Sequence, residues 1–477
     1  MVNTFGKDIV GGYVNGVQVI SIYANGVLVW PDASYYYIKW YPSESSYWGS
    51  IASFSINGST YIVRDYNGDF RDYGGVITES AFSTLRITTL DTNAYRIESY
   101  AFNSCERLGY ATLRNCNYIG DSAFESCKSS SFSLSAPKCT YVGSNAFHSI
   151  GLSRLYLPRC SYVGQSAFRS CTSLTSISLP NCEYVDSRAF GGCGISSVYL
   201  PVCSYVGSYA FNANPLQSVN LPECEYVGDG ALAYADNITY LSLPKCKYLG
   251  EKALKYYLGK SQHSLYLPMC EYVGDAAVEG EGATWMYTVD LPVCSYIGAS
   301  AFANQNNLDS ISLPMCEYIG TSAFLNTAIG GSLLLPACTF IDSWAFWHRF
   351  NTSFTSVYLP ALVSVSLRAF NETGVTYVSL PVCEYIGVGV FASCRLQSVE
   401  LPVCSVLCGN AFGYNPSLSE VTLGYSSVCE LVDGTVFQAT LIDSGTGSIY
   451  VPSSLVDAYK SASYWSVYSS QIFPIQN

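Results

Sequence analysis

Cysteine is the residue of this sequence best able to do chemistry, and it recurs with a regular spacing. Thiols form disulfides, bind metal ions or act as nucleophiles. Most of the 20 cysteines share one position in the phrase LP-x-C-x-Y-[VI]-G-x-x-AF. That column contains Cys116, Cys139, Cys160, Cys182, Cys203, Cys224, Cys246, Cys270, Cys294, Cys316, Cys338, Cys383 and Cys404, with Leu362 in place of a cysteine, Ala94 before the series and Cys429 after it.

The occupants of this column favour a packing role. Disulfide frameworks are typical of short secreted domains that lack a large core, and this chain has 477 residues. A metal site needs clustered ligands with imidazole or carboxylate support, and the only histidines are His148, His263 and His348. A distance of about 5 Å between the Cα atoms of stacked cysteines would still permit a disulfide. Since Ala94 and Leu362 also fit the column, we expect buried thiols that fill space and donate weakly to a turn carbonyl.

Carboxylates offer little for catalysis. Glycoside cleavage needs two carboxylates about 5–10 Å apart in a cleft, and the best pair by register is Glu400 and Glu420. An open sheet provides no pocket to raise one pKa. The sequence has no G-x-S-x-G, H-E-x-x-H or phosphate-loop motif, and DYNGDFRD (65–72) misses the calcium-loop spacing. We therefore expect no enzyme, no metal and no cofactor.

Composition excludes several other classes. The net charge is −12, with 23 Lys and Arg against 35 Asp and Glu, and no basic run is present, so nucleic-acid binding is not expected. The sequence has no stretch of about 18 apolar residues, so no membrane span is expected. The N-terminal MVNTFGKDIVGGYVNG has no basic segment before an apolar one, so no secretory signal is expected.

The elements that position these side chains come from an internal repeat. Sixteen copies, spaced 21 to 25 residues apart, cover roughly residues 80–440. In LTSISLPNCEYVDSRAFGGC, Ile177 and Leu179 point inward from a short strand, Pro180 ends that strand, and Phe190 fills the interior after a tight helical or 3₁₀ turn. One copy cannot bury its apolar set alone, so the copies must stack into a solenoid.

This pattern resembles BspA-type leucine-rich repeats, in the L-P step, the IG-x-x-AF turn and the F-x-x-C ending. That ending occurs at Phe102/Cys105, Phe124/Cys127, Phe168/Cys171, Phe190/Cys193 and Phe391/Cys394. The resemblance implies a right-handed solenoid with a parallel β-sheet on one face, short helical or 3₁₀ turns, a β-rich N-terminal cap and a helical C-terminal cap.

Outward positions of the repeated strands form the candidate binding face. Tyrosine and serine dominate them, as in antibody paratopes, where rigid rings combine with adaptable hydroxyls. The residues predicted to contact a ligand are Arg154, Tyr156, Tyr199, Tyr240, Tyr266, Tyr358 and Tyr377. Ser and Tyr could equally be present because they tolerate a solvated strand, so both interpretations stay open.

A second tyrosine column lies two residues after the cysteine column. It contains Tyr118, Tyr141, Tyr162, Tyr184, Tyr205, Tyr226, Tyr248, Tyr272, Tyr296, Tyr318, Phe340 and Tyr385. Rings stacked one repeat apart would stabilise the solenoid beyond simple burial. We expect a structural ladder, with an aromatic sugar-binding platform as the alternative.

The two ends depart from the repeat. Residues 1–31 predict a small β-meander with Asn-Gly turns, and VNGVQVISIYANGVLVWP resembles N-terminal segments of virion and tail-associated proteins of gut bacteriophages. Residues 32–79 predict a β-rich N-terminal cap that includes SYYYIKWY, and residues 441–477 a C-terminal cap. Within the latter, SLVD (454–457) matches a capping box that would begin a helix.

The functional expectation is a non-enzymatic binding protein. Its most specific form is a bacteriophage virion component, a tail-fibre, receptor-binding or capsid-decorating protein that contacts a host-surface glycan or protein. Residues 1–31 would attach it to other virion proteins. The alternatives are a structural spacer of the virion, in which the repeat only sets length, and a bacterial cell-surface adhesin located outside the cell.

Overall fold

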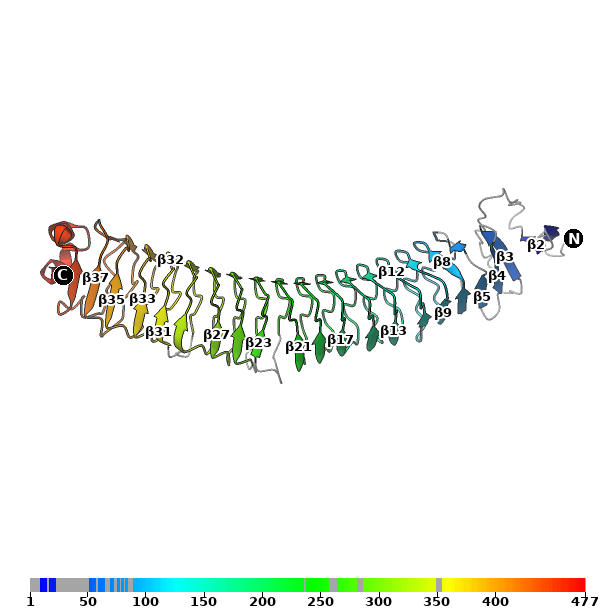
Figure 1. The fold of residues 1–477 in the computed structure, drawn as a ribbon, viewed down its shortest axis with the longest axis horizontal. Coiled ribbons are helices and arrows are strands. Elements are labelled where there is room, and N and C mark those ends of the chain that lie inside the picture. The colour runs from blue at the N-terminus through cyan, green and yellow to red at the C-terminus, as the bar shows by residue number, and fades with distance from the viewer. Residues whose placement is uncertain are drawn as a thin grey trace. The chain divides into compact units, whose positions relative to one another are not determined.

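The computed structural model describes most of the repeat region. Before it, the model describes the strands within 9–14, 17–22, 51–56, 59–64, 69–72 and 75–77 and the short pieces 79–80 and 82–84. It then describes 89–235, 237–256, 264–280, 286–348 and 354–476. The chain divides into two compact units, residues 1–223 and 224–477, here called the N-terminal and C-terminal units. Each is a parallel β-solenoid, as the repeat predicted (Figure 1).

Each repeat in the N-terminal unit contributes one strand to a long ladder, because the L-x-L segment alternates inward apolar and outward polar side chains. In β13, Leu155 is buried while Arg154 and Tyr156 are exposed. Where the pairing is described, successive strands are parallel and in register. The strands of this ladder are β5 (Asp69–Asp72), β7 (Thr89–Thr92), β9 (Tyr110–Leu113), β11 (Ser133–Ser135), β13 (Arg154–Tyr156), β15 (Ser176–Ser178), β17 (Ser197–Tyr199) and β19 (Ser218–Asn220).

A second parallel ladder runs through the Tyr-[VI] step of each repeat, which the sequence analysis had not assigned to a strand. Its members are short, and they pair in register, as Tyr118 does with Tyr141, except for a register shift between Gly75 and Val76. In the N-terminal unit they are β6 (Gly75–Ile77), β8 (Ala94–Ile97), β10 (Tyr118–Ile119), β12 (Tyr141–Val142), β14 (Tyr162–Val163), β16 (Tyr184–Val185) and β18 (Tyr205–Val206). The second residue of each pair is buried and the first is partly exposed.

The C-terminal unit repeats both ladders, and its long ladder is interrupted, since β23-β25-β27, β29-β31-β33 and β35-β37-β39-β40 are separate sheets. Its long ladder comprises β21 (Tyr240–Ser242), β23 (Ser264–Tyr266), β25 (Thr288–Asp290), β27 (Ser310–Ser312), β29 (Gly331–Leu334), β31 (Phe354–Tyr358), β33 (Tyr377–Ser379), β35 (Ser398–Leu401), β37 (Glu420–Leu423), β39 (Ser448–Val451) and β40 (Ile472–Pro474). Its short ladder comprises β20 (Tyr226–Val227), β22 (Tyr248–Leu249), β24 (Tyr272–Val273), β26 (Tyr296–Ile297), β28 (Tyr318–Ile319), β30 (Phe340–Ile341), β32 (Ser364–Val365), β34 (Tyr385–Ile386), β36 (Val406–Leu407) and β38 (Glu430–Leu431).

The Ala-Phe step is a turn and not the helical or 3₁₀ segment that was expected. Only alternate amides bond within the repeat: Ala123 donates to the carbonyl of Gly120, whereas Phe124 donates to the carbonyl of Ala146 in the next repeat at 2.8 Å. This alternation requires positive φ at Ser122 (51°) and Ser126 (60°), a region that most side chains avoid. Because every second amide is used between repeats, the turn stabilises the stack and cannot close a helix.

Two antiparallel hairpins precede the parallel ladders. β1 (Ile9–Val14) pairs with β2 (Val17–Ile22), and β3 (Ile51–Ile56) pairs with β4 (Ser59–Arg64). β4 also pairs antiparallel with β5, which then pairs parallel with β7. The hairpin of β3 and β4 therefore extends the edge of the long ladder. The predicted Asn-Gly turns and SYYYIKWY lie outside the described residues.

The C-terminal segment combines η1 (Ser453–Leu455), α1 (Val456–Ser461), η2 (Ser466–Gln471) and β40. A helix forms where predicted, but the capping box was wrong: Leu455 is the N-cap residue of α1 and no side chain bonds there. The 3₁₀ turn of η1 leads directly into α1 and replaces that cap. The fully buried Trp465 follows, with its Nε1 donating to the carbonyl of Cys429 at 2.7 Å.

Candidate functional site

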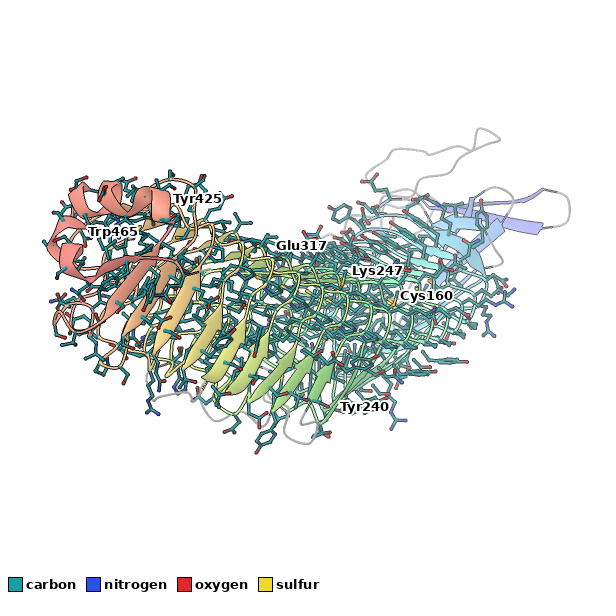
Figure 2. All side chains as sticks on the ribbon, turned by 60° about the vertical axis from the view of Figure 1, so that its left-hand side comes forward. Cys160, Tyr240, Lys247, Glu317, Tyr425 and Trp465 are labelled. Atoms are coloured by element: carbon teal, nitrogen blue, oxygen red, sulfur yellow. The ribbon has the colours of Figure 1, made fainter. Side chains whose placement is uncertain are left out.

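The outward row of the long ladder carries all seven predicted contact residues. Arg154 is exposed, and the six tyrosines expose between 43% and 61% of their surface. Figure 2 shows Tyr240 projecting from the strand side of the C-terminal unit. The alternation of β-strand side chains thus places these residues in solvent, as predicted. Their role in ligand binding remains a prediction.

Among these residues, the structure brings only Tyr358 and Tyr377 into direct aromatic contact. Their ring centroids lie 5.6 Å apart with planes inclined by 51°. The parallel pairing of β29 and β31 sets Leu334, 60% exposed, opposite Tyr358. These three side chains form a contiguous exposed patch, called the aromatic patch below.

The other predicted residues face small or polar neighbours. Tyr156 pairs with Ser178 and Tyr199 pairs with Asn220. In the C-terminal unit, Tyr266 pairs with Asp290. Arg154 pairs with Ser176. Each of these rings is therefore flanked by a group that can form hydrogen bonds, and a ligand could use the ring and the flanking group together.

The second tyrosine column is a ring stack, which confirms the structural ladder. In the N-terminal unit Tyr118, Tyr141 and Tyr162 stack at 4.8 Å with planes inclined by 5°. In the C-terminal unit Tyr248, Tyr272 and Tyr296 stack at 4.8 Å in the same way. Since neighbouring rings cover both faces of an inner member, those faces are closed to a sugar ring.

Burial of this stack changes the tyrosine hydroxyls. The pKa of Tyr248 is raised to about 12, mainly by desolvation and then by charge interactions with the neighbouring Tyr226 and Asp229. Desolvation and a hydrogen bond to Asp186 also raise the pKa of Tyr162. Both hydroxyls therefore stay protonated at physiological pH, and that of Tyr162 donates to Asp186 at 3.0 Å.

The cysteines of the first column are buried and form no disulfides, as predicted. The Sγ of Cys139 donates to the carbonyl of Tyr141 at 3.3 Å, and that of Cys160 to Tyr162 at 3.2 Å. Burial raises the pKa of Cys160 to about 12. The thiol form, and not the reactive thiolate, is therefore the stable species in the fold.

The F-x-x-C cysteines have a hydrogen-bonding role that the sequence analysis missed. The Sγ of Cys127 donates to the carbonyl of Phe102, one repeat earlier, at 3.3 Å. Where this cysteine is absent, Asn214 donates through Nδ2 to the carbonyl of Phe190 at 2.8 Å. Gln305 donates in the same way to Val278 at 2.6 Å. Replacement of cysteine by buried Asn or Gln at one repeat position was the sequence signal for this donor.

Carboxylates do not converge on a cleft in the part of the chain that the structure describes. Glu400 and Glu420 lie on adjacent strands, offset by two residues, and both are exposed on the open strand face. No group of three or more potential metal ligands comes together there. The described residues also include no helix with the length and apolar content needed to cross a bilayer.

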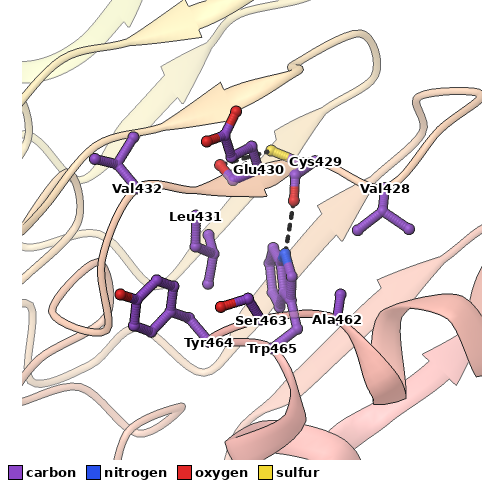
Figure 3. Close-up of a pocket in the computed structure, with 9 residues that line it drawn as sticks. All are labelled: Val428, Cys429, Glu430, Leu431, Val432, Ala462, Ser463, Tyr464 and Trp465. Atoms are coloured by element: carbon purple, nitrogen blue, oxygen red, sulfur yellow. Dashed lines mark hydrogen bonds between the residues drawn. The ribbon is translucent and has the colours of Figure 1, made fainter.

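A pocket of about 350 Å³ lies against the C-terminal segment (Figure 3). Its walls are residues 428–432 of the last short-ladder repeat and residues 462–465, which include the buried Trp465. Glu430 is the one carboxylate among these lining residues. The pocket follows from the packing of Trp465 over the last repeat.

Comparisons with known proteins agree with the repeat. Similar solved structures include a leucine-rich repeat protein from Bacteroides ovatus, with a TM-score of 0.44 and 16% identity, covering 91% of this chain and 100% of that one. Another is the pneumococcal vaccine antigen PcpA, with a TM-score of 0.34 and 18% identity, covering 90% of this chain and 99% of that one.

A third is a leucine-rich cell surface protein from Faecalibacterium prausnitzii, with a TM-score of 0.34 and 16% identity, covering 70% of this chain and 95% of that one. No curated protein matches the chain. The model of the BspA type leucine-rich repeat region matches residues 74–153, 140–259, 271–352 and 339–464 in six copies. With matches over most of its length, the chain belongs to the BspA type leucine-rich repeat family.

Proposed function

We propose that this chain is a non-enzymatic binding protein that presents the outward face of its long ladder to a glycan or protein on a cell surface. The observation that carries the proposal is the aromatic patch of Leu334, Tyr358 and Tyr377, which remains in solvent on a hydrogen-bonded sheet. Exposed tyrosines on a rigid scaffold lose little conformational entropy on binding.

The surroundings of the patch suit a neutral, hydroxyl-rich ligand. Ser356 pairs with Tyr377, and its Oγ donates to the Oγ of Ser332 at 2.8 Å. Ser379 pairs with Tyr358. Aromatic faces contact the apolar faces of sugar rings, while serine hydroxyls both donate and accept hydrogen bonds. A glycan uses both kinds of group.

The finer form of the proposal places the chain on a bacteriophage virion. It is supported by the resemblance of the phrase at residues 14–31, of which the structure describes Val14 at the end of β1 and all of β2. In this form residues 1–31 attach the chain to other virion proteins. Mass spectrometry of purified particles tests it: the chain should be present in the particle, and its absence would leave a cell-surface adhesin.

A glycan array and a host-cell binding assay test the binding face. The wild-type chain should bind, and the double variant Tyr358→Ala/Tyr377→Ala should lose most of that signal, because both rings of the patch are removed. Tyr414→Ala is the matched control, since Tyr414 is also about half exposed, at 48%, but lies in an Ala-Phe turn. Equal binding by the double variant would refute the choice of face, and no binding by the wild type would favour the spacer.

A further inference from the structure

From Met269 onward, an exposed apolar strip runs along the C-terminal unit at the residue just before the first cysteine column. The preceding repeat has Lys245 at this position. Four members of the strip expose at least two fifths of their surface: Met269 (46%), Val293 (41%), Met315 (56%) and Val382 (41%). The apolar strip consists of Met269, Val293, Met315, Ala337, Ala361, Val382, Val403 and Val428. Up to Val403, a proline precedes each member, which widens the apolar surface.

The fold does not require apolar residues at this position. In the N-terminal unit the same column, on the same backbone, contains polar or basic residues in four successive repeats: Asn115, Lys138, Arg159 and Asn181. Each of these also precedes a buried cysteine. The column therefore accepts polar and basic residues, although Val202 of the N-terminal unit is also apolar and 41% exposed. The packing of the repeat thus does not require the uninterrupted run of apolar residues that begins at Met269.

An acidic row lies beside the apolar strip, two residues further along each repeat. Met315 and Glu317 flank the buried Cys316, so both side chains point to solvent. The residues of this row are hydrogen-bonded from repeat to repeat at 2.8–3.0 Å, in the order Glu271, Ser295, Glu317, Thr339, Val363, Glu384, Ser405 and Glu430. All four glutamates are exposed. Figure 2 shows Glu317 on the side of the unit away from Tyr240.

The charge around the strip selects a cationic partner. Residues 264–477 contain sixteen Asp and Glu against four Lys and Arg. Lys247, which pairs with Glu225 at 2.8 Å, lies before the strip begins. An apolar segment that carries Lys or Arg on its flanks would cover the strip and neutralise the acidic row. An anionic lipid surface would be repelled.

The spacing of the strip selects a helix. Successive repeats are about 4.8 Å apart. Side chains on one face of an α-helix recur every three or four residues, about 4.5–6 Å along the axis. Side chains on the same side of an extended strand recur about every 6.6–6.8 Å, so they no longer match the spacing between repeats after the first contact. A helix laid lengthwise therefore keeps contact with successive members.

We propose that the apolar strip and acidic row of the C-terminal unit bind a basic amphipathic helix of a partner protein. This goes beyond the proposed function, because it concerns a different face of the repeat and a different class of ligand. The apolar strip supplies the burial, and Glu271, Glu317 and Glu384 pair with basic residues at the helix edges.

The test uses a fluorescent synthetic peptide of about 18 residues, about 27 Å long as a helix, with Leu on one face and Lys elsewhere. Fluorescence polarisation measures its binding to the full chain. Binding of the wild type is expected, with a Kd at least about tenfold weaker for Met269→Ser/Val293→Ser/Met315→Ser. Glu271→Gln/Glu317→Gln should weaken binding and reduce its dependence on salt.

The controls separate this site from general attraction to an acidic protein. Val202→Ser changes the same column in the N-terminal unit and should leave the Kd unchanged. A Leu and Glu peptide of the same pattern should not bind. Equal affinity of the wild type and the triple serine variant, or no binding by either, would overturn the proposal. So would self-association of the wild type, or its binding to anionic vesicles, if either is lost in the triple variant.

Discussion

The side chain of Asn214 caps the carbonyl oxygen of Phe190, which lies one repeat earlier, at a distance of 2.8 Å. Its Nδ2 also donates to the carbonyl of Phe211 at 2.9 Å, and its Oδ1 accepts from the amide of Ile195 at 3.1 Å. Asn415 makes the same set of bonds to Phe391, Phe412 and Leu396. One buried side chain thus satisfies three backbone groups in neighbouring repeats.

Replacing Asn214 by leucine should destabilise the repeats around it. Each buried backbone group left without a partner costs about 1–3 kcal/mol. Asn214→Cys keeps one donor and should retain more stability, because Cys127 bonds Phe102 from the same position. Hydrogen exchange over residues 190–214 measures the effect locally, since solenoid repeats contact only their neighbours. Equal protection in the leucine variant would contradict the capping role.

Replacing Trp465 by alanine should expose the last repeat. Trp465 is fully buried, packs against Tyr459 with ring centroids 5.1 Å apart, and bonds Cys429. Removing a buried aromatic side chain costs about 3–5 kcal/mol. The midpoint of urea unfolding should fall and hydrogen exchange near β38 should accelerate. Val467→Ala, at a residue 72% exposed, should change neither quantity.

Replacing Tyr272 by alanine should cost more than replacing it by phenylalanine. The ring of Tyr272 stacks at 4.8 Å on Tyr248 and on Tyr296, and each aromatic pair contributes about 0.5–1.5 kcal/mol beyond burial. Phenylalanine keeps both contacts, as Phe340 does beside Tyr318. Thermal unfolding compares the two variants. A Tm for Tyr272→Ala equal to that of the wild type would mean that the stack contributes nothing.

Stability should fall when the pH rises above about 9. Burial raises the pKa of Cys160 to about 12 and that of Cys203 to about 11, from an ordinary value of 9.0. A pKa higher in the folded than in the unfolded state contributes stability that is complete below 9.0 and is lost as the pH rises towards the folded value. Each such thiol costs up to about 1.4 kcal/mol per pH unit in that window.

Urea unfolding at several pH values between about 8 and 10.5 measures this loss. Iodoacetamide labelling at pH 8 is the companion experiment: the buried thiols should react only after unfolding. A midpoint that stays constant over this pH range, or rapid labelling of the native chain, would show that the thiols are not held protonated in the interior.

The repeat made much of the fold predictable. Cys139 and Cys160 occupy equivalent positions in successive copies, so stacking brings equivalent columns together whatever the details of the turn. The same argument predicted the contact between Tyr118 and Tyr141, because identical residues one repeat apart must lie one above the other. Alternation along β13 placed Arg154 and Tyr156 in solvent. These results need only the period and the pattern of apolar residues.

The sequence alone left backbone bonding and local register open. The Ala-Phe turn was expected to be helical, but the amide of Phe124 donates to a carbonyl of the next repeat. The sequence of a single copy does not reveal which of its amides form hydrogen bonds to the neighbouring copy. The capping box at residues 454–457 failed because η1 brings the chain into α1 already turned. Nor did the cysteine pattern reveal that Asn214, in its own repeat, donates the hydrogen bond that Cys127 donates in an earlier repeat.

The sequence by itself determined the repeat, its buried columns and its exposed rows, because periodicity fixes which side chains must share a face. The tertiary structure decided which exposed side chains meet. The shift in register between Gly331 and Ser332 sets Leu334 opposite Tyr358, beside Tyr377. Such neighbours depend on loop length and strand register between copies, and these are settled only when the repeats pack.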